Sequence, residues 1–138
     1  MNNLKYFESK KILVTGASGV VGYNLCKRLL DIPYCDVHVN YLNPPGINFK
    51  NLLRASNHHI FDITDLDKID SLPQFDVIFH CSGYGQPQKF VKNPSKTFAL
   101  NTLSLQSLAN KTREQFVFIS TSEIYSESEG NSEETNII

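Results

Sequence analysis

The segment Thr15–Gly22 restricts the fold of this chain more than any other part of its sequence. Its three glycines have the spacing Gly-x-x-Gly-x-x-Gly, and they follow the apolar run Ile12–Val14 almost directly. The residues after them, Val20–Asp31, repeat their apolar positions with a helical period. A strand, a glycine turn and a helix in this order predict a β-α unit of an α/β fold.

The glycine spacing is close to the dinucleotide-binding fingerprint, although its first gap is two residues long. Gly16 would make the tight turn, Gly19 would let the backbone approach a pyrophosphate, and Gly22 would allow close contact between helix and strand. The phosphates would lie at the N-terminus of the helix. The candidate cofactor contacts of this loop are Gly16, Ser18, Gly19, Val20, Val21 and Gly22. The alternative is an ordinary β-α turn that binds nothing.

Short apolar runs alternate with stretches of helical period along the rest of the chain. We expect strands at Lys11–Thr15, Asp36–Tyr41, His58–Phe61, Asp76–His80 and Gln115–Ser120. We expect helices at Val20–Asp31, Leu66–Ser71 and Pro94–Lys111, with a weaker one at Asn48–Ala55. This alternation predicts a doubly wound parallel sheet of about five strands, the Rossmann architecture.

Two features mark the ends of these elements. Asn93 and Pro94 predict the start of the last helix, with an Asn side chain as N-cap and proline at the first helical position. From Ser126 to Ile138 the sequence turns polar, with too little apolar surface to order by itself. We therefore expect one domain over residues 1–125 and a flexible loop or tail over residues 126–138.

The composition favours a small-molecule partner. The 13 Lys and Arg nearly balance the 14 Asp and Glu and form no block of like charge, which argues against a nucleic acid or an anionic membrane surface. The three cysteines form no Cys-x-x-Cys pair, so they favour reduced thiols in a cytoplasmic protein over a disulfide or zinc site. We expect no signal peptide at the polar N-terminus, and the apolar runs are too short to span a bilayer.

The end of the second predicted strand should contact the adenosine ribose of a dinucleotide. The candidates there are Asn40 and Asn43, and an amide can bond a 2′-hydroxyl without repelling a 2′-phosphate. The residues thus leave NAD and NADP open, while the lack of Arg in this turn favours NAD. Asp62, followed by Ile63, closes the third predicted strand. Its carboxylate either accepts a hydrogen bond from the adenine amino group or caps a turn.

Together these motifs make the chain resemble the extended short-chain dehydrogenase/reductase family, the NAD-dependent epimerase/dehydratase group, over roughly residues 10–126. The family's fourth-strand pattern, apolar residues followed by His and small residues, matches residues 77–83, and its Asn-Pro helix start matches Asn93-Pro94. The resemblance implies that NAD is the cofactor and that Asn101 braces the site. It also implies that the nicotinamide ribose lies against Cys81, Ser82 and Gly83.

The fifth predicted strand ends in a sequence similar to the family's Ser-Thr-x-Glu-x-Tyr-Gly signature, with Ser126 in place of the glycine. The resemblance implies that Thr121 bonds the sugar hydroxyl being oxidised and that Glu123 assists proton chemistry. Ser122 stands where dehydratases carry an Asp, which makes UDP-glucuronate decarboxylase the nearest subfamily and a 4-epimerase the next. The alternative for these three residues is a polar strand end that needs caps.

The family's acid/base pair, Tyr-x-x-x-Lys, does not follow Tyr125 within the 138 residues. The spacing occurs at Tyr6 with Lys10 and at Tyr23 with Lys27, but both pairs precede or lie within the first β-α unit. We therefore expect the chain to stop before the catalytic helix and the substrate domain of a sugar-nucleotide enzyme that works through a transient 4-keto sugar. The alternatives are a non-catalytic nucleotide-binding module and an inactive relic.

Two further expectations concern partners. The tandem His58-His59 lacks a ligand-spaced companion, so we expect no metal. Apolar residues on the last strand and helix would need a cover, and they predict a homodimer. These residues are Phe98, Leu103, Leu105, Phe116, Phe118 and Ile119.

Overall fold

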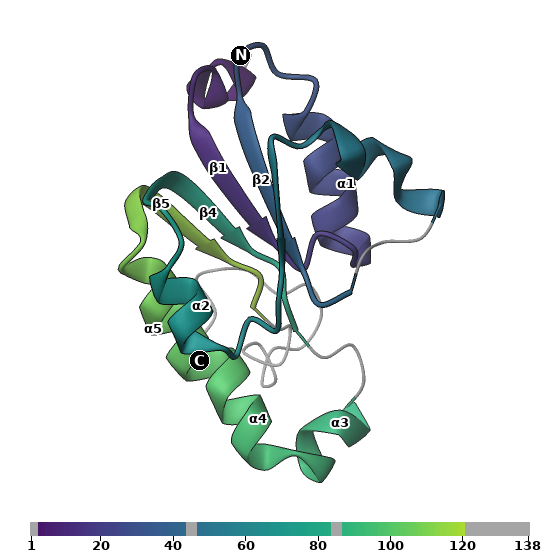
Figure 1. The fold of residues 1–138 in the computed structure, drawn as a ribbon, viewed down its shortest axis with the longest axis vertical. Coiled ribbons are helices and arrows are strands. Elements are labelled where there is room, and N and C mark those ends of the chain that lie inside the picture. Colours follow the sequence, from purple (N-terminus) through teal and green to yellow (C-terminus); the bar gives the residue numbers. More distant parts are fainter. Residues whose placement is uncertain (1–2, 44–46, 84–86, 121–138) are drawn as a thin grey trace, which may run out of the picture.

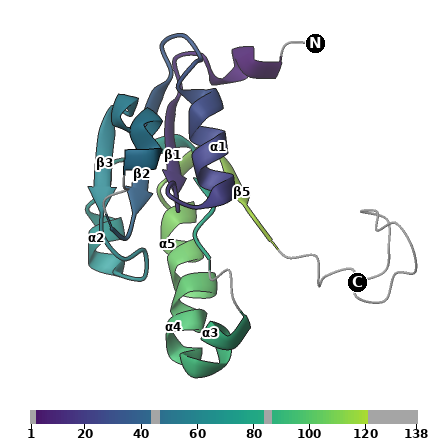
Figure 2. The same cartoon turned by 90° about the vertical axis from the view of Figure 1, so that its right-hand side faces the viewer.

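The computed structural model of the chain describes residues 3–43, 47–83 and 87–120. Five parallel strands form one sheet in the order β3-β2-β1-β4-β5 (Figures 1 and 2). The strands are β1 (Lys11–Thr15), β2 (Asp36–Tyr41), β3 (Asn57–Ile60), β4 (Phe75–His80) and β5 (Thr112–Phe118). The order reverses at β1, from which the chain first builds outward to β3 and then crosses back to β4. This arrangement confirms the predicted doubly wound parallel sheet.

Helical segments connect the strands and cover both faces of the sheet. They are η1 (Asn3–Phe7), α1 (Val20–Leu29), η2 (Ile47–Arg54), α2 (Leu66–Asp70), α3 (Pro87–Lys92), α4 (Pro94–Phe98), η3 (Ala99–Leu103) and α5 (Ser104–Ala109). Figure 1 shows α1 on one side of the sheet and α2 with α5 on the other. α3 and α4 extend beyond the carboxyl ends of the strands, where ligands bind in sheets of this type.

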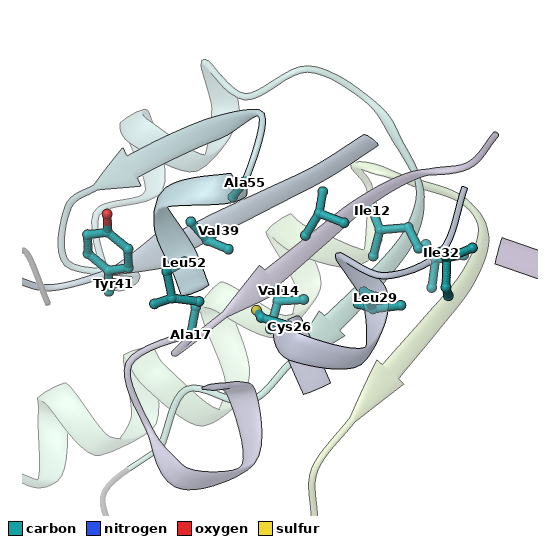
Figure 3. Close-up of a cluster of buried hydrophobic side chains, with 12 residues drawn as sticks. Ile12, Val14, Ala17, Cys26, Leu29, Ile32, Val39, Tyr41, Leu52 and Ala55 are labelled. Atoms are coloured by element: carbon teal, nitrogen blue, oxygen red, sulfur yellow. The ribbon is translucent and has the colours of Figure 1, made fainter. Parts of the chain in front are cut away.

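The side chains of β1 alternate between two apolar cores, as the pleat of a strand requires. Ile12 and Val14 point into the core under α1 and η2, which Figure 3 shows in close-up. Leu13 points into the second core, where Ile69 of α2 and Leu108 of α5 cover it. Because every residue from Ile12 to Val14 is fully buried, β1 is a central strand covered on both faces.

The last helical stretch differs from the single regular helix expected over Pro94–Lys111. It consists of α4, the π-helical turn η3 and α5, and it ends at Ala109. Asn93 lies at the predicted N-cap position, but its side chain makes no capping hydrogen bond, so that expectation was wrong. Its backbone carbonyl instead accepts hydrogen bonds from the amide and the hydroxyl of Thr97.

The remaining differences lie at the ends of elements and in short helices. β5 begins three residues before the predicted Gln115, because Thr112 pairs with Phe75 of β4 although its strand neighbours are polar. α1 ends at Leu29 rather than Asp31, and β3 begins at Asn57 rather than His58. η1 and α3 were not expected. The predicted tail, residues 126–138, lies outside the described part of the chain.

Candidate functional site

A cavity of about 300 Å³ opens at the carboxyl ends of the strands, around the point where the strand order reverses. The glycine loop, the ends of β2, β3 and β4, and one side of the last helical stretch contribute to its walls. The lining residues are Gly16, Ser18, Gly19, Asn40, Tyr41, Leu42, Phe61, Asp62, Ile63, Thr64, Cys81, Ser82, Gly83, Lys96 and Leu100. The position is the one where open α/β sheets bind ligands.

The glycine loop follows β1 and packs backbone against backbone. Gly16 has a φ of +62°, and a Cβ atom there would lie 2.7 Å from the carbonyl oxygen of Cys81. A Cβ atom at Gly22 would overlap the carbonyl group of Gly16, and one at Gly19 would lie 3.2 Å from the same oxygen. The loop therefore needs glycine at two positions for close approach, as the sequence predicted for a tight turn and for helix-strand contact.

Three of the six predicted loop contacts do not line the cavity. Val20 and Val21 begin α1 with exposed side chains, and Gly22 packs against the backbone of Gly16. Ser18 does line the cavity, next to Gly19. The loop thus contributes two glycines and one serine to the cavity wall, residues that suit the approach of phosphate oxygen atoms.

The end of β2 presents no charged side chain to the cavity. Asn40 is buried, and its side-chain nitrogen donates hydrogen bonds to the carbonyls of His59 and Phe61, at 3.0 and 3.2 Å. This amide therefore ties β2 to the strand beside it. Asn43 is exposed and does not line the cavity, whereas Leu42 does. Of the two predicted ribose contacts, only Asn40 belongs to the cavity, and its amide nitrogen already has acceptors.

Asp62 caps a turn, which is one of the two roles that the sequence left open, and it also lines the cavity. Its Oδ1 accepts hydrogen bonds from the backbone amide and the hydroxyl of Thr64, at 3.1 and 2.8 Å. Its Oδ2 pairs with Lys96 Nζ at 2.5 Å. Burial alone would raise the pKa of Asp62, but the hydrogen bonds from Lys96 and Thr64 outweigh burial and lower it below the usual value.

The end of β4 forms the opposite wall. Cys81, Ser82 and Gly83, the residues predicted to lie against the nicotinamide ribose, all line the cavity. Burial raises the pKa of the Cys81 thiol to about 11, so this sulfur is a neutral wall atom at neutral pH. The preceding residue, His80, is fully buried, and burial lowers its pKa to about 4. A neutral imidazole therefore lies directly beneath this wall.

Six lining residues were not predicted: Tyr41, Leu42, Phe61, Thr64, Lys96 and Leu100. The first four flank predicted positions at the ends of β2 and β3, and the last two belong to the last helical stretch. Lys96 lies in α4 and Leu100 in the π-helical turn η3. Their spacing of four residues places them on one face of a helix, and this was the signal available in the sequence. Asn101, the predicted bracing residue, is half-buried and does not line the cavity.

The predicted catalytic residues Thr121, Ser122 and Glu123 lie outside the described residues. One of the two Tyr-x-x-x-Lys pairs near the N-terminus, Tyr6 with Lys10, lies away from the cavity. Both side chains contact Glu114, and Lys10 immediately precedes β1, at the end of this strand that is opposite to the cavity.

The two adjacent histidines of β3 contact different side chains. His58 interacts with Tyr41, and His59 interacts with His38. Among residues 3–43, 47–83 and 87–120, no three His, Cys, Asp or Glu side chains gather in a way that could hold a metal ion. In the same ranges, no helix has the length and apolar character needed to cross a membrane.

Comparisons with known proteins agree with this geometry. UDP-glucuronic acid decarboxylase 6 of Arabidopsis thaliana is 31% identical over 132 residues, which are 91% of this chain and 38% of that protein. UDP-glucuronic acid decarboxylase 1 of Danio rerio is 29% identical over 127 residues, 88% of this chain and 30% of that protein. The chain therefore spans well under half the length of these two relatives.

Solved structures of two sugar-nucleotide epimerases are also similar to this chain. The UDP-glucuronic acid 4-epimerase from Bacillus cereus, in complex with UDP-glucuronic acid and NAD, superposes with a TM-score of 0.70 at 28% identity, over 92% of this chain and 45% of that one. The UDP-Glc/GlcNAc 4-epimerase from Campylobacter jejuni reaches a TM-score of 0.75 at 25% identity, over 92% and 42%. The model of the NAD dependent epimerase/dehydratase family matches residues 12–137. The chain belongs to the NAD-dependent epimerase/dehydratase family.

Proposed function

We propose that the chain binds NAD in the cavity and forms the nucleotide-binding part of a sugar-nucleotide enzyme. The observation that carries this proposal is the packing of Gly16 against the backbone of Cys81 and Ser82 at the carboxyl edge of the sheet. It brings the phosphate-binding loop and the β4 wall together around one cavity. The family and the NAD-containing epimerase structure support the choice of NAD.

Different residues of the cavity would bind different parts of the cofactor. The backbone of Gly16, Ser18 and Gly19 suits the pyrophosphate, and the β3 end with Asp62 and Ile63 suits the adenine. Cys81, Ser82 and Gly83 would then face the nicotinamide ribose. No carboxylate at the end of β2 opposes a 2′-phosphate, so NADP is the second ligand to measure.

NAD, when bound, would accept a hydride from a sugar carbon and later return it, so that the 4-keto sugar would exist only transiently. We propose that the whole enzyme is a UDP-glucuronate decarboxylase, a lyase, or else a 4-epimerase, an isomerase. The names of the relatives and Ser122 in place of an Asp support this order. Thr121 would bind the sugar hydroxyl, and Glu123 would assist the proton transfer at the neighbouring carbon.

A nucleotide-binding module without catalysis is the second candidate, with an inactive relic as its variant. The 138 residues contain no Tyr-x-x-x-Lys pair after Tyr125. A positioned base contributes a factor of about 10² to 10⁴ to the rate, so we expect these residues alone to turn over no sugar nucleotide. Turnover of UDP-glucuronate by the purified chain would contradict this.

The proposal also covers the cellular location and the oligomeric state of the protein. Cys26, Cys35 and Cys81 form no disulfide in the structure, which supports a reducing, cytoplasmic location. The outer side of β5 pairs with no described strand, which supports a homodimer.

Titration calorimetry of the purified chain with NAD and with NADP tests the proposal. We expect weak but measurable binding of NAD. Gly19→Leu should abolish it while the circular dichroism spectrum stays that of a folded protein, because the added side chain would stand where the pyrophosphate approaches. A folded wild-type chain that gives no heat with either dinucleotide would refute the proposed function.

A further inference from the structure

One end of the cavity is bridged by an ion pair between two segments that are distant in the sequence. Asp62 follows β3, and Lys96 lies in α4, 34 residues further along the chain. Among the described residues that line the cavity, these two are the charged ones. Because the charges oppose each other and pair at 2.5 Å, the cavity lining carries no net charge.

The pair contributes little to the stability of the fold. The Lys96 side chain is 46% exposed and that of Asp62 is 32% exposed. Exposed ion pairs of this kind typically stabilise a protein by about 0 to 1 kcal/mol, since water screens the charges and the long side chain loses freedom. The main effect of Lys96 is therefore on the position and ionisation of Asp62.

Both oxygens of Asp62 are held. Thr64 donates twice to Oδ1, and Lys96 donates to Oδ2, so rotation of the carboxylate would break at least one of these bonds. Each carboxylate oxygen accepts about two hydrogen bonds, which leaves Oδ2 one acceptor position beside Lys96. The group thus presents a fixed, ionised acceptor at the cavity wall.

An acceptor of this kind distinguishes two classes of purine. A 6-amino group donates a hydrogen bond to the carboxylate, whereas a 6-oxo group is an acceptor and is repelled by it. The base of a dinucleotide whose pyrophosphate lies on the glycine loop would reach the β2 and β3 side of the sheet, where Asp62 and Ile63 line the cavity.

We propose that Lys96 is a positioning residue that acts through Asp62 and makes the cavity select a 6-aminopurine dinucleotide over its 6-oxopurine analogue. The inference rests on the proposed function, since it requires a dinucleotide in this cavity. Without Lys96, Oδ2 loses its fixed donor and the carboxylate turns more freely around its bonds to Thr64. The discrimination then falls, even though Asp62 remains.

The test compares the binding of NAD and of nicotinamide hypoxanthine dinucleotide to the full 138-residue chain. We expect the wild type to prefer NAD by about tenfold, the effect of one hydrogen bond to a charged group. Lys96→Met should reduce this preference to about twofold, and Lys96→Arg should restore most of it. A general loss of structure would weaken both ligands alike and leave their ratio unchanged.

The matched control is Lys10→Met, which breaks an ion pair of the same length with Glu114 at the other end of β1. It should leave the ratio at the wild-type value. A wild type that binds neither dinucleotide overturns the proposed function and this inference together. A wild type that binds NAD but shows no preference, or a Lys96→Met variant that keeps the preference, overturns the inference alone.

Discussion

The hydroxyl of Thr15 lies 2.8 Å from Nδ1 of His80, and both groups are fully buried. These residues end the neighbouring strands β1 and β4, so each immediately precedes one wall of the cavity. Among the described residues, Nε2 of the same ring has no hydrogen-bond partner. The Thr15 hydroxyl is therefore the side-chain group that fixes this imidazole between β1 and the rings of Phe116 and Phe118.

Thr15→Val should destabilise the chain and weaken NAD binding. The substitution keeps the shape of the side chain but leaves Nδ1 of His80 without its partner in the core, which costs about 1 to 3 kcal/mol. Urea unfolding and calorimetry measure the two effects. Thr112→Val is the control, because it removes a hydroxyl bonded to Leu108 at the opposite end of the sheet. It should lower stability without changing NAD affinity, and equal binding losses in both variants would contradict the prediction.

Stability should decrease as the pH is lowered from about 6.5 to 4. Burial lowers the pKa of His80 and of His59 to about 4 in the folded chain, whereas an unfolded histidine titrates near 6.5. Between pH 4 and 6.5 the unfolded state binds more protons than the folded state does. The stabilisation by the two neutral histidines is therefore fully present above pH 6.5 and is lost towards pH 4.

His80→Phe provides the check on the pH dependence. It keeps an aromatic ring beside Phe116 and removes one titrating group, so the slope of unfolding free energy against pH should fall by about one proton, or 1.4 kcal/mol per pH unit. Denaturant unfolding at a series of pH values measures the slope. An unchanged slope would show that His80 is not the group that titrates.

Gly16→Ala should destabilise the fold strongly. The residue has a left-handed backbone conformation, which costs a residue with a Cβ atom about 1 to 2 kcal/mol, and the new atom would also collide with Cys81. Gly83→Ala is the control for stability, since a Cβ atom there meets no atom within 4 Å. Thermal unfolding should separate the two variants clearly, and equal midpoints would contradict the role assigned to Gly16.

The chain should form a two-fold dimer through the β5 edge or the last helical stretch. Phe98 is 58% exposed and Ile119 is 45% exposed, and β5 is the last strand of the described sheet on its side. Apolar surface of this kind favours association with a second copy. Sedimentation should show a dimer that Phe98→Glu or Ile119→Lys weakens, and a wild-type monomer at high concentration would refute it.

β1 and β2 occupy the predicted ranges, Lys11–Thr15 and Asp36–Tyr41. β1 was predictable because burial on both faces requires continuous apolar residues, and β2 because Val37 and Val39 alternate with polar residues. β5 is different, since its first residues are polar and their place in the sheet comes from backbone pairing with β4. Such pairing leaves no pattern in the side chains, so the beginning of an edge strand was not visible in the sequence.

The site was predictable where backbone shape decides it and less so where side chains meet from distant segments. The glycine loop needs glycine for steric reasons, and the spacing between a predicted strand and a predicted helix located it. Asn40 was expected to be free for a ribose, but its nitrogen bonds to backbone that follows almost twenty residues later. The pairing of Asp62 with Lys96 likewise depends on how α4 lies over the sheet, which local sequence does not encode.

The π-helical turn Ala99–Leu103 limits how this helix can change in length. A regular α-helix turns by about 100° per residue, so four residues exceed a full turn by about 40°. The wider π-helical turn rotates less per residue and therefore offsets this excess. Lys96, Leu100, Ser104 and Leu108 thereby stay close to one line, with the first two at the cavity and the last two in the core. Removal of one residue from the turn would give a uniform helix but rotate Lys96 by about 100° relative to Leu108. Insertions and deletions are therefore better tolerated before Pro94 than within this turn.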